Sequence, residues 1–196
     1  MEDINLKDNN IKEEINIKAP ELNEDEKSGE AKMNFFNAYQ EKTVQKLIGL
    51  ILDYYNDNLV SFVIYGSYAR DEARLNSDID LFIILTHKED LKSTIERFYE
   101  NIEKNIAAEL TVLYTKYGID MDLSPFILST EEANYFHPIY LDMIDNAELI
   151  YDKNNFFKQI LNSVSELKTK YGFRKEPVGN TFLWDIKNKN LLGERI

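Results

Sequence analysis

Two short motifs carry the residues most able to do chemistry, Gly66-Ser67 and Asp78-Ile79-Asp80, and each adjoins an apolar run. A glycine lets the backbone approach a ligand closely, and the free N–H groups where a helix begins suit a phosphate. The Ser67 hydroxyl adds a further hydrogen-bond donor. We therefore expect the turn at Gly66-Ser67 to hold the phosphates of a nucleotide.

Asp78 and Asp80 stand two residues apart at the start of an apolar run. Side chains alternate along a strand, so both carboxylates are expected on one face of it. Two like charges this close need a cation between them, and Mg²⁺ prefers carboxylate and phosphate oxygens. A later run offers a third carboxylate for a two-metal site, either Asp120 or Asp122, again on one face.

Such a site would perform an in-line displacement at the α-phosphorus of a nucleoside triphosphate. One metal would activate the attacking hydroxyl while the other holds the triphosphate. The departing pyrophosphate would be held by the Gly-Ser turn and by Arg70 or Arg74, whose charges complement it. Alternatively, these two arginines are surface charges that pair with neighbouring acidic side chains.

The spacing Gly-Ser, ten residues, Asp-x-Asp resembles the signature of the DNA polymerase β-type nucleotidyltransferases. Residues 66–80 match it without a gap, and the Ser-Asp-Ile-Asp-Leu of 77–81 is similar to the prokaryotic minimal nucleotidyltransferase branch. In that branch a glycine often follows the arginine, whereas this chain has Asp71 after Arg70.

The resemblance implies that the Gly-Ser turn holds the phosphates of the NTP, expected to be ATP, and that the Asp-x-Asp pair binds Mg²⁺ or Mn²⁺. The third carboxylate would act as base or metal ligand. We favour Asp122 over Asp120 for this role, because Asp122 directly precedes Leu123 in the expected strand. The predicted catalytic and metal-binding residues are thus Asp78, Asp80 and Asp122, and the predicted nucleotide-binding residues are Gly66, Ser67, Arg70 and Arg74.

Three hypotheses cover what the protein does with the nucleotide. Members of the minimal branch often act as antitoxins that transfer AMP to a tyrosine of a neighbouring HEPN-domain toxin, which implies a protein acceptor. The second acceptor is a small molecule, as in aminoglycoside nucleotidyltransferases, although those usually carry a larger helical C-terminal domain. The third hypothesis is a non-catalytic, antitoxin-like binding module. A nucleic-acid partner is disfavoured, since the net charge of −12 opposes phosphate binding.

The elements that must position these residues follow from hydrophobic periodicity. Before and within the motifs we expect a helix over 33–56, strands over 59–65 and 78–85, and a short helix over 68–74. A long helix follows Asp90 and ends at Gly118. The remaining expected elements are a strand over 119–128, a helix with a capping box at 129–132, a strand over 148–151, a helix over 156–171, a loop over 172–181 and an edge strand over 182–186. This order predicts an α/β (α+β) fold, a small mixed β-sheet of the nucleotidyltransferase type covered by helices.

Residues 1–32 differ in composition from the rest of the chain. They hold no aromatic residue and carry 10 acidic against 5 basic residues, a net charge of −5. A stretch this polar buries too little apolar surface to fold, so we expect a disordered acidic tail. The remainder divides into a nucleotidyltransferase core over 33–130 and a helical C-terminal extension over 131–196, which could add an edge strand.

Cysteine and histidine usage narrows the chemistry further. The chain has no cysteine, which excludes disulfides, thiolate metal sites and cysteine nucleophiles. Only two histidines are present, too few for a multi-histidine zinc site. The polar, acidic start of the sequence does not have the pattern of a signal peptide, and no apolar run reaches the roughly 20 residues of a membrane span. We therefore expect a cytoplasmic protein with no membrane partner.

Overall fold

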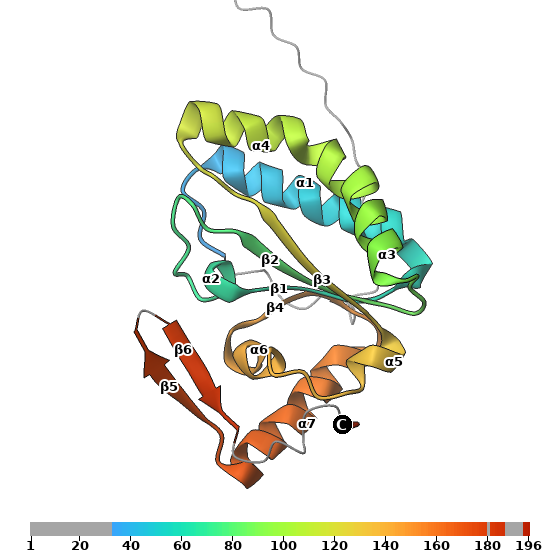
Figure 1. Cartoon of the computed structure of the whole chain (residues 1–196). Coiled ribbons are helices and arrows are strands. Elements are labelled where there is room, and N and C mark those ends of the chain that lie inside the picture. Colours follow the sequence, from blue (N-terminus) through green and yellow to red (C-terminus); the bar gives the residue numbers. More distant parts are fainter. Residues whose placement is uncertain (1–32, 180, 187–193) are drawn as a thin grey trace, which may run out of the picture.

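A four-stranded mixed sheet forms the centre of the molecule, in the order β3-β2-β1-β4 (Figure 1). The computed structural model describes residues 33–179, 181–186 and 194–196, so the predicted acidic tail lies outside the described residues. The central strands are β1 (Leu59–Tyr65), β2 (Ile79–Leu85), β3 (Leu123–Ser129) and β4 (Glu148–Asp152). β1 pairs antiparallel with β2 and β4, whereas β2 pairs parallel with β3. The predicted mixed sheet covered by helices is confirmed.

β1 and β2 are the inner strands and both are almost completely buried. Helices cover both faces of the sheet, so a strand at its centre must be apolar on both sides. This explains why the two strands appear in the sequence as continuous apolar runs. β4 lies in the stretch that we assigned to the C-terminal extension, so one strand of the sheet comes from beyond residue 130.

One face of the sheet is covered by α1 (Ala38–Tyr55), α3 (Leu91–Phe98) and α4 (Lys104–Tyr117), as Figure 1 shows. α1 begins later than predicted, because the Asn37 side chain accepts a hydrogen bond from the Gln40 N–H and caps the helix there. Asp90 caps α3 in the same way, through the Ser93 N–H. A π-helical segment, Tyr99–Glu103, joins α3 to α4, and Gly118, with a φ of 67°, ends α4.

The opposite face is covered by α5 (Thr130–Ala133), α6 (Tyr140–Asn146) and α7 (Phe156–Tyr171). The predicted capping box is confirmed, since Ser129 and Glu132 exchange hydrogen bonds between side chain and backbone. Short 3-10 turns precede β1 and α7 at Asn56–Asn58 and Lys153–Asn155. In the described ranges, none of the helices combines the length and the hydrophobicity needed to cross a bilayer.

The C-terminal part of the chain forms a second, two-stranded sheet from β5 (Arg174–Val178) and β6 (Thr181–Asp185). The predicted loop over 172–181 is therefore wrong for most of its length. β5 was not predicted for two reasons. All its residues are exposed, so apolar and polar positions do not alternate, and it contains Pro177, a residue that is rare in strands. β6 pairs with β5, and the hairpin stands apart from the central sheet (Figure 1).

Candidate active site

The end of β1 brings a glycine directly against a carboxylate of β2. Tyr65, the last residue of β1, pairs with Asp80, and Gly66 follows with a φ of 73°. A Cβ atom at position 66 would overlap the Asp80 carboxylate. Position 66 thus needs glycine for two separate reasons, its left-handed backbone conformation and the absence of space for a side chain.

Asp78 directly precedes β2, Asp80 is its second residue, and both line the same cavity, which has a volume of about 370 Å³. Asp78 is exposed and Asp80 is half-buried. Burial, followed by the charge of Asp78, raises the pKa of Asp80, while the Arg70 charge and a hydrogen bond from Ser124 oppose the shift. The two carboxylates therefore repel each other and would gain from a cation.

The helix after β1 is shorter and begins earlier than predicted. α2 spans Gly66–Ala69, so the predicted helix over 68–74 is wrong beyond Ala69. Asp71 has a φ of 59° and lies where the minimal branch often has glycine, a residue that adopts this conformation without strain. The Asn34 amide donates a hydrogen bond of 2.8 Å to the Asp71 carboxylate. The departure from the family pattern therefore falls on a turn and not on the carboxylate pair.

Arg70 and Arg74 have different surroundings. Arg70 lines the cavity, and its Nε contacts the Glu72 carboxylate at 2.8 Å. Arg74 is exposed and is not among the cavity residues, although its backbone N–H donates to the Ser77 hydroxyl. The structure thus brings five predicted residues together at the cavity: Gly66, Ser67, Arg70, Asp78 and Asp80.

Other residues line this cavity that the sequence did not point to. They come from the end of β1, the turn before β2, the segment that leads into α6, α6 itself and the β5–β6 hairpin: Tyr65, Ser77, Ile139, Asp142, Lys175 and Phe182. Tyr65 and Ser77 adjoin the two motifs along the chain. No sequence motif marks the other four, because the packing of α6 on the sheet and the position of the hairpin bring them to the cavity. Among these four, only the charges of Asp142 and Lys175 and the ring of Phe182 could have indicated a role.

Asp142 joins α6 to the hairpin at the cavity. Its Oδ1 accepts hydrogen bonds from Lys175 Nζ at 2.8 Å and from Trp184 Nε1 at 3.2 Å. The Lys175 ammonium also lies over the rings of Phe182 and Trp184, 5.4 and 5.6 Å from their centroids. These contacts fix a cation at the cavity that Asp78 and Asp80 also line.

The β3 side of the site carries Ser124 and Asp122. Ser124 pairs with Asp80 in the parallel register, and its hydroxyl bonds to the Asp80 carboxylate. The Asp122 carbonyl accepts the Ile79 N–H at 2.9 Å, which places Asp122 beside Asp78. Asp122 and Asp120 are exposed and neither lines the cavity. In the part of the chain that the structure describes, no three acidic or histidine side chains are arranged as a metal site.

Comparison with known proteins agrees with this geometry. The family model described as Polymerase beta, Nucleotidyltransferase matches residues 45–156, more than half of the chain. A predicted protein adenylyltransferase of Methanocaldococcus jannaschii is 28% identical over 136 residues, which are 68% of this chain and 81% of that protein. The matched family region contains β1 to β4 together with the Gly-Ser turn and the Asp-x-Asp pair.

Solved structures show more distant likenesses. A spectinomycin adenyltransferase, AAD(9), of Enterococcus faecialis is 13% identical, with 67% of this chain and 68% of that chain covered and a TM-score of 0.45. A chain from the complex of tri-AMPylated Shewanella oneidensis HEPN toxin with MNT antitoxin is 14% identical, with 68% and 92% covered and a TM-score of 0.37. Likenesses this distant do not identify a substrate or a partner. The family match, together with the Asp80 carboxylate packed against Gly66, establishes that this chain belongs to the polymerase β nucleotidyltransferase family and is a nucleotidyltransferase.

Proposed function

We propose that the protein transfers AMP from ATP to a hydroxyl group of another protein, in a reaction that depends on Mg²⁺ or Mn²⁺ and releases pyrophosphate. The observation that carries the proposal is the packing of Gly66 against Asp80, with Asp78 lining the same cavity. This arrangement sets backbone N–H groups and two carboxylates at one place, as a metal–triphosphate complex requires.

The chemistry of the donor set supports a divalent cation at Asp78 and Asp80. Both groups offer hard oxygen ligands, and the raised pKa of Asp80 indicates that its charge lacks compensation in the metal-free protein. A bound Mg²⁺ would neutralise the two carboxylates and stabilise the charge that develops at the α-phosphorus. The Ser124 hydroxyl would keep Asp80 oriented toward the cavity.

The phosphates would be held by neutral and cationic groups around the same cavity. Gly66 and Ser67 present the N–H groups that begin α2, and Arg70 adds a guanidinium. Lys175 supplies a second cation from the hairpin. Arg74 is exposed outside the cavity, so we assign it a role only in the long-range attraction of the nucleotide.

The transfer step needs a group that accepts a proton. The acceptor hydroxyl attacks the α-phosphorus, the bond from this phosphorus to the bridging oxygen breaks, and pyrophosphate leaves. We assign the hydroxyl proton to Asp122, whose backbone bond to β2 places it beside Asp78. Asp142 remains bound to Lys175 and Trp184, so it acts as a positioning residue for the phosphate-binding cation.

Two observations favour a protein as the acceptor. The M. jannaschii relative, of which the match covers 81%, carries the name of a protein adenylyltransferase. Beside the cavity, the hairpin exposes three large apolar side chains, Val178, Phe182 and Leu183, each 49–59% accessible, which suits contact with a protein surface. Within this class, the sequence resemblance to the minimal branch makes a tyrosine of a HEPN-type toxin the acceptor that we would test first.

Label transfer tests the proposal directly. Purified protein is incubated with Mg²⁺ and α-labelled ATP, with and without host lysate, and acceptors are separated by size. We expect label on a protein with wild type but not with Asp78→Asn or Asp80→Asn. Asp53→Asn is the matched control, because Asp53 is an exposed residue of α1 outside the cavity.

Other outcomes would replace the proposal. Label on a small molecule would identify an antibiotic-type transferase. If no label moves, and Asp80→Asn still neutralises a copurifying partner, the protein acts as a binding module. Equal label transfer by Asp80→Asn and wild type would exclude the assigned metal site.

A further inference from the structure

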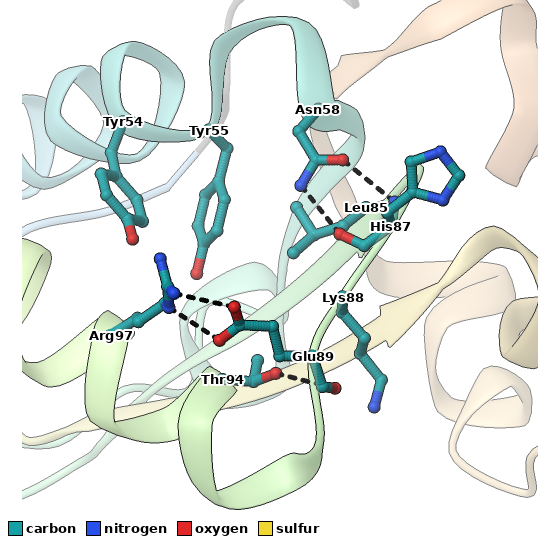
Figure 2. Close-up of a pocket in the computed structure, with 9 residues that line it drawn as sticks. All are labelled: Tyr54, Tyr55, Asn58, Leu85, His87, Lys88, Glu89, Thr94 and Arg97. Atoms are coloured by element: carbon teal, nitrogen blue, oxygen red, sulfur yellow. Dashed lines mark hydrogen bonds and ion pairs between the residues drawn. The ribbon is translucent and has the colours of Figure 1, made fainter.

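A second cavity, of about 360 Å³, lies at the other end of the β1–β2 pair. It is enclosed by the C-terminal turn of α1, the loop after β2 and the first turns of α3 (Figure 2). Seven residues of extended strand separate the two ends, a distance of about 20 Å. None of the residues that line this second cavity lines the nucleotide cavity, so it can bind a ligand independently of the transfer reaction.

The Tyr55 hydroxyl marks this cavity as a binding site. The side chain is 8% exposed, and its hydroxyl has no hydrogen-bond partner among residues 33–179, 181–186 and 194–196. In Figure 2 the hydroxyl points toward the pair formed by Arg97 and Glu89. Buried hydroxyl groups almost always have a partner. A ligand that supplies one would complete the site.

The polar groups around Tyr55 are held in place before any ligand binds. Arg97 Nε and Nη2 each contact the Glu89 carboxylate at 2.7 Å, and the Thr94 hydroxyl bonds to the Glu89 carbonyl. On the opposite side, the Asn58 side chain exchanges two hydrogen bonds with the His87 backbone, which fixes the loop after β2. A guanidinium has five N–H donors, so Arg97 keeps donors beyond the two atoms that hold Glu89.

The cavity also has an aromatic wall beside its hydrogen-bond donors. The Tyr54 and Tyr55 rings pack edge to face, with their centroids 4.8 Å apart, and Leu85 adds an apolar surface. Of the charged residues that line the cavity, Arg97 is paired with Glu89, and Lys88 contacts the Glu132 carboxylate at 3.0 Å. An aromatic surface suits a planar group, and the remaining guanidinium donors of Arg97 together with the Tyr55 hydroxyl suit an anionic acceptor.

We propose that this cavity binds a small molecule that combines a planar ring with a carboxylate or phosphate group. Tyr55 donates a hydrogen bond to the anionic group, Arg97 contacts the same group, and the tyrosine rings contact the planar part. A nucleoside monophosphate and a simple aromatic acid share this chemistry, and the test separates these two sources.

The test uses the full-length protein, labelled with ¹⁵N, without metal. AMP and phenyl phosphate are titrated, with adenosine and phenol as uncharged counterparts, and dissociation constants come from the amide shifts of Thr94 and Arg97. We expect at least one anionic probe to bind, with its uncharged counterpart about 10-fold weaker. Tighter binding of AMP indicates a nucleotide ligand, and tighter binding of phenyl phosphate indicates an aromatic acid.

Two variants of neighbouring tyrosines make the test specific. Tyr55→Phe should weaken the anionic probe about 10-fold and remain folded, because the lost hydroxyl has no partner among the described residues. Tyr54→Phe is the matched control, since the Tyr54 hydroxyl already accepts from Asn101, and should bind the probe as wild type does. Arg97→Gln should also weaken binding. The proposal is overturned if no probe shifts these amides at about 10 mM, or if Tyr55→Phe binds as tightly as wild type.

Discussion

The two ends of the β1–β2 pair hold cavities of almost equal volume, about 370 Å³ at Asp80 and about 360 Å³ at Tyr55. They differ in how their charges are compensated. At the Asp80 end, three carboxylates face two cations, and the pKa of Asp80 is raised by burial and by Asp78. At the Tyr55 end, Glu89 is paired with Arg97, and the group that lacks a partner within the described residues is a neutral hydroxyl.

This difference shows which of the two ends holds groups that destabilise the folded protein. Uncompensated charge and a left-handed glycine occur together at the catalytic end, where the bound metal and nucleotide would relieve them. At the Tyr55 end the Glu89 carboxylate is paired with Arg97. The Tyr55 hydroxyl there has no hydrogen-bond partner among the described residues. Removing a carboxylate charge at the first end should therefore lower activity and raise stability, whereas removing the Tyr55 hydroxyl at the second should change stability slightly and activity not at all.

Replacing Asp80 should produce the largest effect on transfer activity. A small effect would contradict the difference between the two ends of the β1–β2 pair. Asp80→Asn removes a metal ligand, so we expect transfer activity to fall at least about 1,000-fold. The same variant should melt at a higher temperature than wild type in EDTA, because an ionised Asp80 is disfavoured in the folded state. Activity is measured by label transfer and stability by calorimetry.

The sign of the pH dependence follows from the raised pKa of Asp80. Below the unfolded pKa of about 3.9, the carboxyl group is protonated in both states. As the pH rises through the higher folded pKa, wild type loses stability that the asparagine variant keeps. The difference in melting temperature should therefore grow from pH 4 to pH 7, and a constant difference would contradict the assigned cause.

Gly66→Ala should cost about 3 kcal/mol of unfolding free energy, because the new side chain meets Asp80 and the backbone is left-handed. Gly49→Ala is the matched control. Gly49 lies inside α1, and a methyl group added there would meet nothing within 4 Å, so alanine should stabilise by up to about 1 kcal/mol. Urea unfolding of both variants measures the two effects, and equal effects would show that position 66 is not constrained.

Variants of Asp120 and Asp122 test which of these two residues acts as the third carboxylate. Asp122→Asn should lower kcat about 100-fold if Asp122 accepts the hydroxyl proton, while Asp120→Asn should leave it within about twofold. Asp142→Asn should instead raise the KM for ATP, because it releases Lys175. Steady-state kinetics on the three variants distinguishes these roles. A larger loss of kcat from Asp142→Asn than from Asp122→Asn would transfer the proton-accepting role to Asp142.

The smallest effects come from two buried tyrosines, one at each end. The Tyr68 hydroxyl, in α2, accepts a 2.8 Å hydrogen bond from Gln40, and burial raises the pKa of Tyr68 to about 12. Tyr68→Phe should destabilise by about 1–3 kcal/mol, because the buried Gln40 amide loses this acceptor. Tyr55→Phe should be neutral or stabilise by about 1 kcal/mol. A loss of stability from Tyr68→Phe in chemical denaturation, without a loss from Tyr55→Phe, would confirm the difference between the two ends, and a marked loss from Tyr55→Phe would contradict it.

Much of the fold and the centre of the site could be predicted from the sequence. The apolar runs of β1 and β2, the capping box at Ser129 and the periodicity of α7 are local patterns, and a local pattern is visible along the chain. The Gly-Ser turn and the Asp-x-Asp pair were predictable for the same reason, since the first directly follows β1 and the second lies at the start of β2, the next strand along the chain.

Only the tertiary structure decided the rest. Lys175 and Phe182 reach the catalytic cavity because the β5–β6 hairpin folds back beside α6, and a fully exposed strand such as β5 leaves no periodic signal. The parallel register of β2 and β3 set Ser124, and not a carboxylate, beside Asp80. Tyr55 belongs to the apolar stripe of α1. It became a candidate ligand-binding residue only in the folded protein, because the loop after β2 and α3 surround its hydroxyl and no described residue supplies a hydrogen-bond partner. The sequence by itself determined the reaction chemistry through adjacent motifs, whereas long-range packing decided which distant side chains surround it.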